Sequence, residues 1–283
     1  MGHRLFPVRA ALLAVITVTA GSTPEAALGQ ASAQTVGIRL VDAPTNRTND
    51  PRAHEYIVDH VAPGTTITRR VEVANGTAKT QAVQLYAAAG TIQGGNFQFG
   101  DGHAANELTS WTTVDPGTVG PPPGGKSLAT VKIAVPKNAS AGERYAVVWA
   151  ELPAAVPSGG GVGEVNRVGV RIYLSVGPGG EPPTDFQITT LQGRRAGDGS
   201  PVVAATVHNT GGRALDLSGE LSLTSGPGGL SAGPFSATLG TTLGLGQTEP
   251  VQVTLDKALP NGPWDAKITL RSGTTVRDAS ASI

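Results

Sequence analysis

The sequence contains no cysteine and little charge. Its 283 residues include 21 Lys and Arg and 21 Asp and Glu, so the formal net charge is zero. Without cysteine, the chain has no disulfides, no thiolate metal ligands and no cysteine nucleophile. Balanced charge offers no basic patch for nucleic acid, so we expect no nucleic-acid partner.

Aromatic residues are also scarce, at 4%, whereas turn formers are abundant. Gly (39) and Pro (21) together make up about one residue in five, against roughly one in eight in an average protein. The glycines follow no three-residue repeat, which excludes a collagen-like chain. A hydrophobic content of 39% excludes a chain kept unfolded by its charge. The length favours two domains or one large β domain.

The N-terminus has the pattern of a secretory signal peptide. Arg4 and Arg9 precede the apolar run 10–20, and Ala31–Ala33 fits the small-residue cleavage pattern. We therefore expect cleavage of residues 1–33 and an extracytoplasmic location, secreted or in the cell envelope. No later run reaches 18 apolar residues, so we expect no stable membrane span after cleavage.

Beyond the signal peptide, apolar residues alternate with polar ones. Thr66–Val73, Thr130–Val135 and Val168–Val176 all follow a period of two, which is typical of strands with one buried face. Gly and Pro interrupt these runs every 8–12 residues, as in β-sandwiches. The sequence predicts an all-β protein with two immunoglobulin-like β-sandwich domains in tandem.

A turn-rich linker at 177–183 sets the predicted domain boundary. We expect an N-terminal domain over 34–178 and a C-terminal domain over 183–283. Both lengths are ordinary for a β-sandwich.

The two halves also resemble each other. Residues 131–137 align with 251–257 at an offset of 120, and strands ending at Asn75 and Asn209 occupy similar places in each half. An internal repeat of this kind indicates one topology used twice. Chance similarity between halves of biased composition is the alternative.

Residues that could carry catalysis are few and scattered. The sequence has neither H-E-x-x-H nor G-x-S-x-G. His54 and His60 would lie about 20 Å apart on a strand, too far for one metal. We expect no enzyme activity, no catalytic residue, no cofactor and no metal. A Ser, His and Asp arrangement assembled only in space remains an alternative.

Three aromatic residues are the candidate ligand-binding residues. Phe97 and Phe99 share one face of a hairpin predicted over 91–99, and Trp111 lies in a polar loop. Glycan-binding modules often present an exposed ring to a sugar, and the alternative for Trp111 is packing.

Several segments, taken in order, resemble a known family. They are Val36–Pro44, Tyr56–Thr65, Arg70–Asn75, Gly94–Asn96, Trp111, Val135–Pro136 and Ala141–Tyr145. The order is similar to that of the WxL-interacting surface proteins of Gram-positive bacteria, in an actinobacterial variant. Members usually continue into a C-terminal membrane helix, which this sequence lacks before it ends at Ile283.

The resemblance implies a non-enzymatic cell-envelope protein. Its first domain would bind peptidoglycan or another cell-wall glycan, and its second would bind surface proteins, possibly of the WxL type. The alternative is a structural or adhesion module that pairs with other proteins through sheet edges or loops, without binding a glycan.

Overall fold

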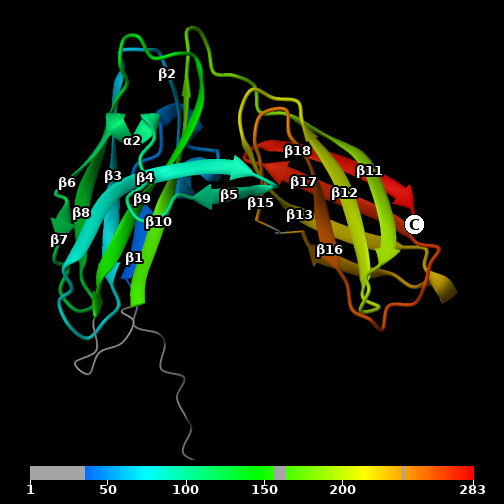
Figure 1. Ribbon diagram of the computed structural model, residues 1–283. Helices are drawn as coiled ribbons and strands as arrows, with labels where there is room; N and C mark the ends of the chain where they lie inside the picture. Colours follow the sequence, from blue (N-terminus) through cyan, green and yellow to red (C-terminus); the bar gives the residue numbers. More distant parts are fainter. Residues whose placement is uncertain (1–35, 156–163, 238–239) are drawn as a thin grey trace, which may run out of the picture. The chain divides into compact units, whose positions relative to one another are not determined.

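The computed structural model describes residues 36–155, 164–237 and 240–283, and the predicted signal peptide at 1–33 lies outside them. As predicted, the chain is all-β and folds into two β-sandwiches in tandem (Figure 1). The predicted linker at 177–183 lies between the last strand of the first sandwich and the first strand of the second.

The first sandwich has one sheet in the order β1-β3-β8-β6 and another in the order β2-β10-β9-β4-β5, with β7 paired to β4. Its strands are β1 (Val36–Leu40), β2 (Ile57–Val61), β3 (Thr66–Asn75), β4 (Val83–Gln93), β5 (Asn96–Phe99), β6 (Thr112–Asp115), β7 (Thr118–Val119), β8 (Lys126–Ala134), β9 (Gly142–Ala155) and β10 (Glu164–Val176). Short helices η1 (Thr45–Arg47), α1 (Arg52–Glu55) and α2 (Glu107–Trp111) lie in its connections. All of these pairs are antiparallel except β2 with β10.

The second sandwich has a sheet in the order β11-β12-β16 and another in the order β14-β13-β17-β18, with β15 paired to β13. Its strands are β11 (Phe186–Arg195), β12 (Pro201–Asn209), β13 (Leu215–Thr224), β14 (Ala232–Ser236), β15 (Thr241–Leu243), β16 (Thr248–Thr254), β17 (Asp265–Ser272) and β18 (Thr275–Ser282), and η2 (Pro227–Gly229) follows β13.

The two sandwiches share one strand order. The sheet β1-β3-β8 corresponds to β11-β12-β16, and β10-β9-β4-β5 corresponds to β18-β17-β13-β14. The 120-residue offset found in the sequence therefore pairs β8 with β16, which occupy the same place in their sheets.

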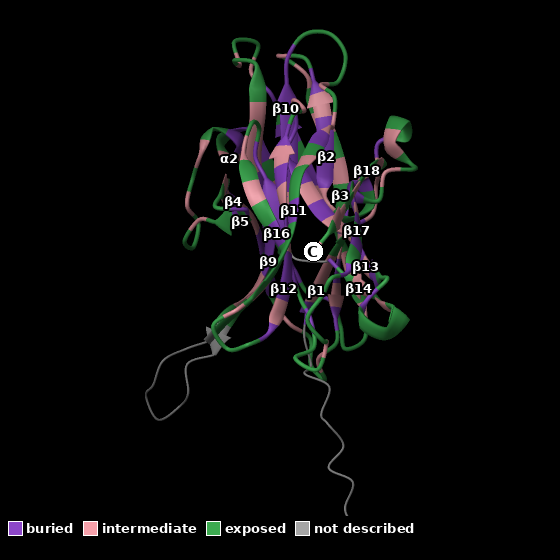
Figure 2. Ribbon diagram, turned by 90° about the vertical axis from the view of Figure 1, so that its right-hand side faces the viewer, coloured by how far each residue is buried: buried purple, intermediate pink, exposed green. Residues whose placement is uncertain are grey.

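Each sandwich encloses its own hydrophobic core. In β8, Ala129, Val131 and Ile133 are buried while Lys132 is exposed, so the period of two places alternate side chains inside. Burial of one such aliphatic side chain contributes about 1.5–3 kcal/mol. In β9 and β10 the buried residues are consecutive, because both faces of this sheet are covered (Figure 2).

Asn75 closes the end of β3 from a buried position, with 1% of its surface exposed. Its Oδ1 accepts from the backbone N–H of Thr77 at 2.9 Å. Its Nδ2 donates to the carbonyls of Lys79 and Pro121, both at 2.8 Å. A single side chain thus satisfies backbone groups of two loops, among them the buried carbonyl of Pro121.

Asn209 does the same at the end of β12. It is 1% exposed, and its Oδ1 accepts from the N–H of Gly211 at 3.0 Å. Its Nδ2 donates to the carbonyls of Arg213 at 2.8 Å and Gly244 at 3.0 Å. The partners two and four residues ahead match those of Asn75, so the repeat extends to individual hydrogen bonds.

We predict that Asn75→Ala and Asn209→Ala each lower the free energy of unfolding by about 2–3 kcal/mol. Each substitution leaves buried carbonyls without a donor, and such groups cost about 1–3 kcal/mol. Urea unfolding measures the change, and Asn138→Ala, at an exposed loop position, is the matched control. A loss no larger than that of Asn138→Ala would show that the two caps are dispensable.

Candidate functional site

Half of β10 forms an open sheet edge. Residues Ile172–Val176 pair with β9 on one side and with β2 on the other. Residues Glu164–Arg171 pair with β9 alone, and within the described chain no strand pairs with their other side. β1 runs nearby in the opposite sheet but forms no ladder with β10. Free N–H and C=O groups on such an edge can pair with another chain.

The side chains of this open segment are unusually exposed for apolar residues. Val165 is 51% exposed and Val168 is 38% exposed. Val168 points to the same side of β10 as Val170 and Ile172, which belong to the buried core. The core face of the sheet is thus left partly uncovered where the edge is unpaired.

The opposite face of the same segment carries aromatic residues. Gly169 is exposed, and a Cβ there would lie 2.7 Å from the Trp149 ring, so glycine is what lets the indole lie against the strand. The Arg167 guanidinium covers that ring at 4.4 Å, and Phe99 meets it edge-on at 4.9 Å.

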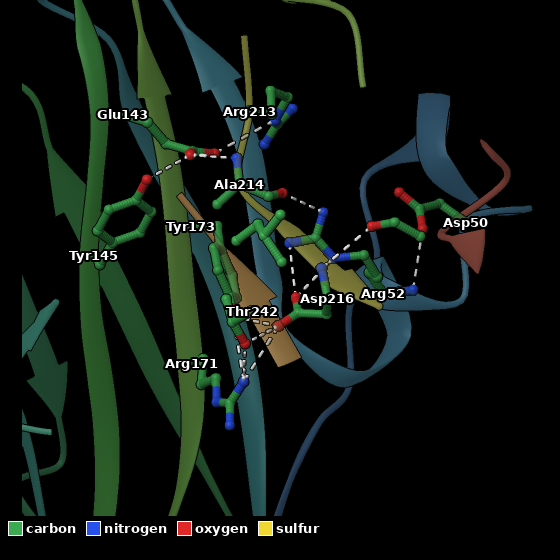
Figure 3. Close-up of polar contacts among 12 residues, drawn as sticks. Asp50, Arg52, Glu143, Tyr145, Arg171, Tyr173, Arg213, Ala214, Asp216 and Thr242 are labelled. Carbon is green, nitrogen blue, oxygen red and sulfur yellow. Dashed lines mark hydrogen bonds and ion pairs between the residues drawn. The ribbon is translucent and has the colours of Figure 1, made fainter. Parts of the chain in front are cut away.

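Further along β10, the strand enters a buried polar cluster shared by both sandwiches (Figure 3). Its centre is Asp216 on β13. Arg52 from α1 donates through Nε to Asp216 Oδ2 at 2.9 Å and lies within 2.8 Å of it through Nη2. The Tyr173 and Thr242 hydroxyls each donate to Oδ1 at 2.8 Å, and Arg171 Nη1 lies 3.3 Å from the same atom.

A second polar group lies beside the first. The Glu143 side chain, on β9, accepts from the backbone N–H of Ala214 at 2.7 Å and from the Tyr145 hydroxyl at 2.8 Å. Arg213 is 1% exposed, and its Nε lies 3.6 Å from Glu143 Oε1. Arg213 also pairs with Glu181, in the segment that links the two sandwiches.

Burial determines the protonation of the tyrosines in this cluster. Burial and the Asp216 carboxylate raise the pKa of Tyr173 well above its ordinary value. Burial and Glu143 do the same to the pKa of Tyr145. Burial also raises the pKa of Glu143, against the hydrogen bonds from Tyr145 and Ala214, which lower it. Both tyrosine hydroxyls therefore stay protonated and act as donors.

The contacts of this cluster join the two sandwiches. Two arginines and two hydroxyls surround the carboxylate of Asp216, and both hydroxyls donate to it. Loss of one partner would leave a buried charge uncompensated. The cluster, which we call the Asp216 joint (Arg52, Arg171, Tyr173, Asp216 and Thr242), thus ties β10 of the first sandwich to β13 of the second.

The three residues predicted to bind a ligand lie in different environments. Phe97 is 6% exposed and packs with Tyr173 and Tyr145. Phe99 is 42% exposed, and its ring lies 5.3 Å from that of Phe97. Trp111, at the end of α2, is 9% exposed and has the Arg144 guanidinium 4.8 Å above its ring. The structure brings Phe97 and Phe99 together, and ligand contact by all three stays a prediction.

Sequence reasoning missed the Asp216 joint and the open edge of β10. Arg52 and Asp216 lie 164 residues apart, and nothing local marks them as partners. The alternation of Val168–Val176 can be seen in the sequence. The sequence does not show which strand each of these residues pairs with.

The described ranges also bear on metal binding and membrane insertion. There, no group of three or more His, Cys, Asp or Glu side chains could hold a metal ion. No helix among these residues has the length and apolar character needed to cross a membrane.

Comparison with known proteins gives structural neighbours only. No family model matches the chain, and no curated protein matches it. Similar solved structures include the E. coli chaperone DraB, at 13% identity and a TM-score of 0.43, covering 88% of this chain and 99% of the other. The YadV chaperone has 10% identity and a TM-score of 0.43, with coverages of 88% and 99%.

A third similar structure is the chaperone–tip adhesion subunit pre-assembly complex CsuC–CsuE of Acinetobacter baumannii. It has 13% identity and a TM-score of 0.42, covering 79% of this chain and 94% of the other. Identities and TM-scores this low do not assign a function to this chain.

The predicted membership of the WxL-interacting family is wrong, because the neighbours are bacterial chaperones and not proteins of that family. The segments that carried the resemblance have local structural roles. Gly64 turns the chain at φ +84°, Gly94 and Gly95 form the hairpin turn at φ +57° and +72°, and Asn75 is the strand cap. Such features serve a β-sandwich whatever it binds.

We predict that Arg52→Met lowers the free energy of unfolding by about 3 kcal/mol, the lower end of the cost of breaking a buried pair, because it leaves the partly buried Asp216, with its side chain 18% exposed, without its main cation. The matched control is Arg39→Met, whose pair with Glu72 has a 60% exposed arginine; the loss of so exposed a pair should change the stability little. Urea unfolding measures both. The double variant Arg52→Met/Asp216→Leu should recover part of the loss, and equal effects of Arg52→Met and Arg39→Met would contradict a role for the joint.

Proposed function

We propose that this chain is a non-enzymatic, extracytoplasmic binding protein of two immunoglobulin-like sandwiches. It pairs with a partner protein, itself secreted or on the cell surface, that adds a β-strand along the open edge of β10. The observation that carries the proposal is that, among the residues the structure describes, Glu164–Arg171 has a partner strand on one side only.

Strand addition suits both the backbone and the side chains of this edge. Main-chain hydrogen bonds supply affinity without regard to sequence, and alternate side chains supply specificity. Val168 is exposed on the side of the core, so an apolar residue of an added strand would remove its surface from water. Each such contact contributes about 25 cal/mol per Å² of apolar area.

The Asp216 joint supports the same edge from its other end. Arg171 closes the open segment, and Tyr173, two residues on, donates to Asp216. One continuous strand therefore links the edge to the second sandwich. A binding edge held in this way is preorganised, which reduces the entropy lost on association.

We predict that a photo-crosslinking amino acid at Val168 forms covalent adducts with another protein in intact producing cells. The same substitution at Leu245 is the control, because Leu245 is 45% exposed but lies in the loop between β15 and β16. Adducts are detected by immunoblotting and identified by mass spectrometry. Equal yields at both positions would indicate contact without specificity for the edge.

The identified partner then allows a direct test of strand pairing. In the non-covalent complex, hydrogen exchange should be slower at those amides of 165–171 that point to the open edge, since added ladder hydrogen bonds protect them. Val168→Glu should weaken the complex at least tenfold, and Leu245→Glu should leave it unchanged. Protection confined to loops, with the β10 amides unaffected, would rule out strand addition.

A further inference from the structure

An apolar cavity opens at one end of the second sandwich, and neither the Asp216 joint nor the open edge of β10 lines it. Its volume is about 210 Å³. It lies between the turn that joins β11 to β12 and the loop that joins β16 to β17. Its floor consists of buried side chains from the core: Val203, Leu223, Leu255 and Trp264.

The residues around the opening are exposed or half-buried. They include Arg194, Arg195, Leu259, Pro260 and Asn261. The indole N–H of Trp264 donates to the Pro260 carbonyl at 3.1 Å. The tryptophan ring therefore forms part of the floor and is tied to the rim by one hydrogen bond.

Two glycines keep this end of the sandwich closely packed against Ile283. A Cβ on Gly193 would lie 3.2 Å from the Ile283 side chain, and one on Gly262 would lie 2.6 Å from its carbonyl oxygen. The same oxygen accepts from the backbone N–H of Trp264 at 2.9 Å. Close backbone contacts at Ile283 therefore fix this wall of the cavity.

The side chains at the opening carry positive charge. Arg194 donates to the Gln252 amide oxygen at 2.9 Å. Arg195 donates to Asn261 Oδ1 and to the carbonyls of Gly199 and Leu259. All four acceptors are neutral, and neither arginine forms an ion pair within the described chain. No Asp or Glu lines the cavity.

We propose that this cavity binds a small organic monoanion with a compact apolar body, such as an arylalkanoate. The apolar body would occupy the floor over Trp264, and the carboxylate would lie at the rim beside Arg194.

The size and polarity of the cavity select this class of ligand. An apolar cavity of about 150 Å³ is large enough to bind benzene, so 210 Å³ accommodates an aromatic ring with a short side chain. Ligand sites for larger molecules measure about 300–1,000 Å³. An apolar floor with cations at its opening complements a ligand that is apolar at one end and anionic at the other.

Trp264 provides the readout. The chain has three tryptophans, and the other two, Trp111 and Trp149, lie in the first sandwich. Phenylacetate is the probe, and its neutral amide, phenylacetamide, tests the charge. The full chain, labelled with ¹⁵N, is titrated while the indole N–H resonance of Trp264 is followed.

We expect saturable shifts of the Trp264 resonance, with a phenylacetate dissociation constant on the order of a millimolar for a ligand of this size. Phenylacetamide should bind about threefold more weakly, which is the scale of one exposed charge contact. Arg194→Gln should remove this difference, whereas Arg277→Gln, at an exposed arginine of β18 outside the cavity, should preserve it.

A filling variant tests the location. Leu259→Phe adds volume at a half-buried rim position and should weaken both probes at least tenfold while the other tryptophan resonances stay in place. Absence of any Trp264 shift up to the solubility limit of phenylacetate overturns the site. Unchanged binding in Leu259→Phe also overturns it, and equal affinity for acid and amide in the unmodified chain overturns the assigned charge.

Discussion

The attachment of the two sandwiches to each other depends on the contacts of the Asp216 carboxylate. It belongs to β13 of the second sandwich, yet three of its donors, Arg52, Arg171 and Tyr173, come from the first. The Asp216 side chain is 18% exposed, and a carboxylate withdrawn this far from water is costly unless donors surround it. The same contacts favour this arrangement of the two sandwiches, because it supplies donors to both oxygens of the carboxylate.

Strands β9 and β10 are buried on both faces of their sheet. The core of the first sandwich covers one face, and separate side-chain clusters cover the other. In β9, Ala146 and Val148 point into the core of the first sandwich, while Val147 and Trp149 belong to a separate cluster on the outer face. Tyr173 and Phe97 form another outer cluster together with Ala214 of the second sandwich. The outer face is therefore apolar where Ala214 of the second sandwich packs on it. Outside that contact, the outer face carries the aromatic ring of Trp149.

The strands and their repetition were predictable because they depend on local patterns. Alternation marked β3, β8 and β10, and the Asn residues at 75 and 209 marked equivalent strand ends. The joint was not predictable, since the pairing of Arg52 with Asp216 arises only once two domains meet. Trp111 shows the same limit: its loop is polar in sequence, but α2 turns the ring inward beneath Arg144.

The edges of the sheets differ in how they are protected. Strand β14 carries Pro234 and β16 carries Pro250, which remove backbone donors from those edges, and β6 is only four residues long. The open part of β10 has neither proline nor a short length, and it presents exposed valines. An unprotected edge of this kind would favour aggregation unless a partner covers it. The exposed valines of this unpaired segment therefore support the proposal that it pairs with another chain.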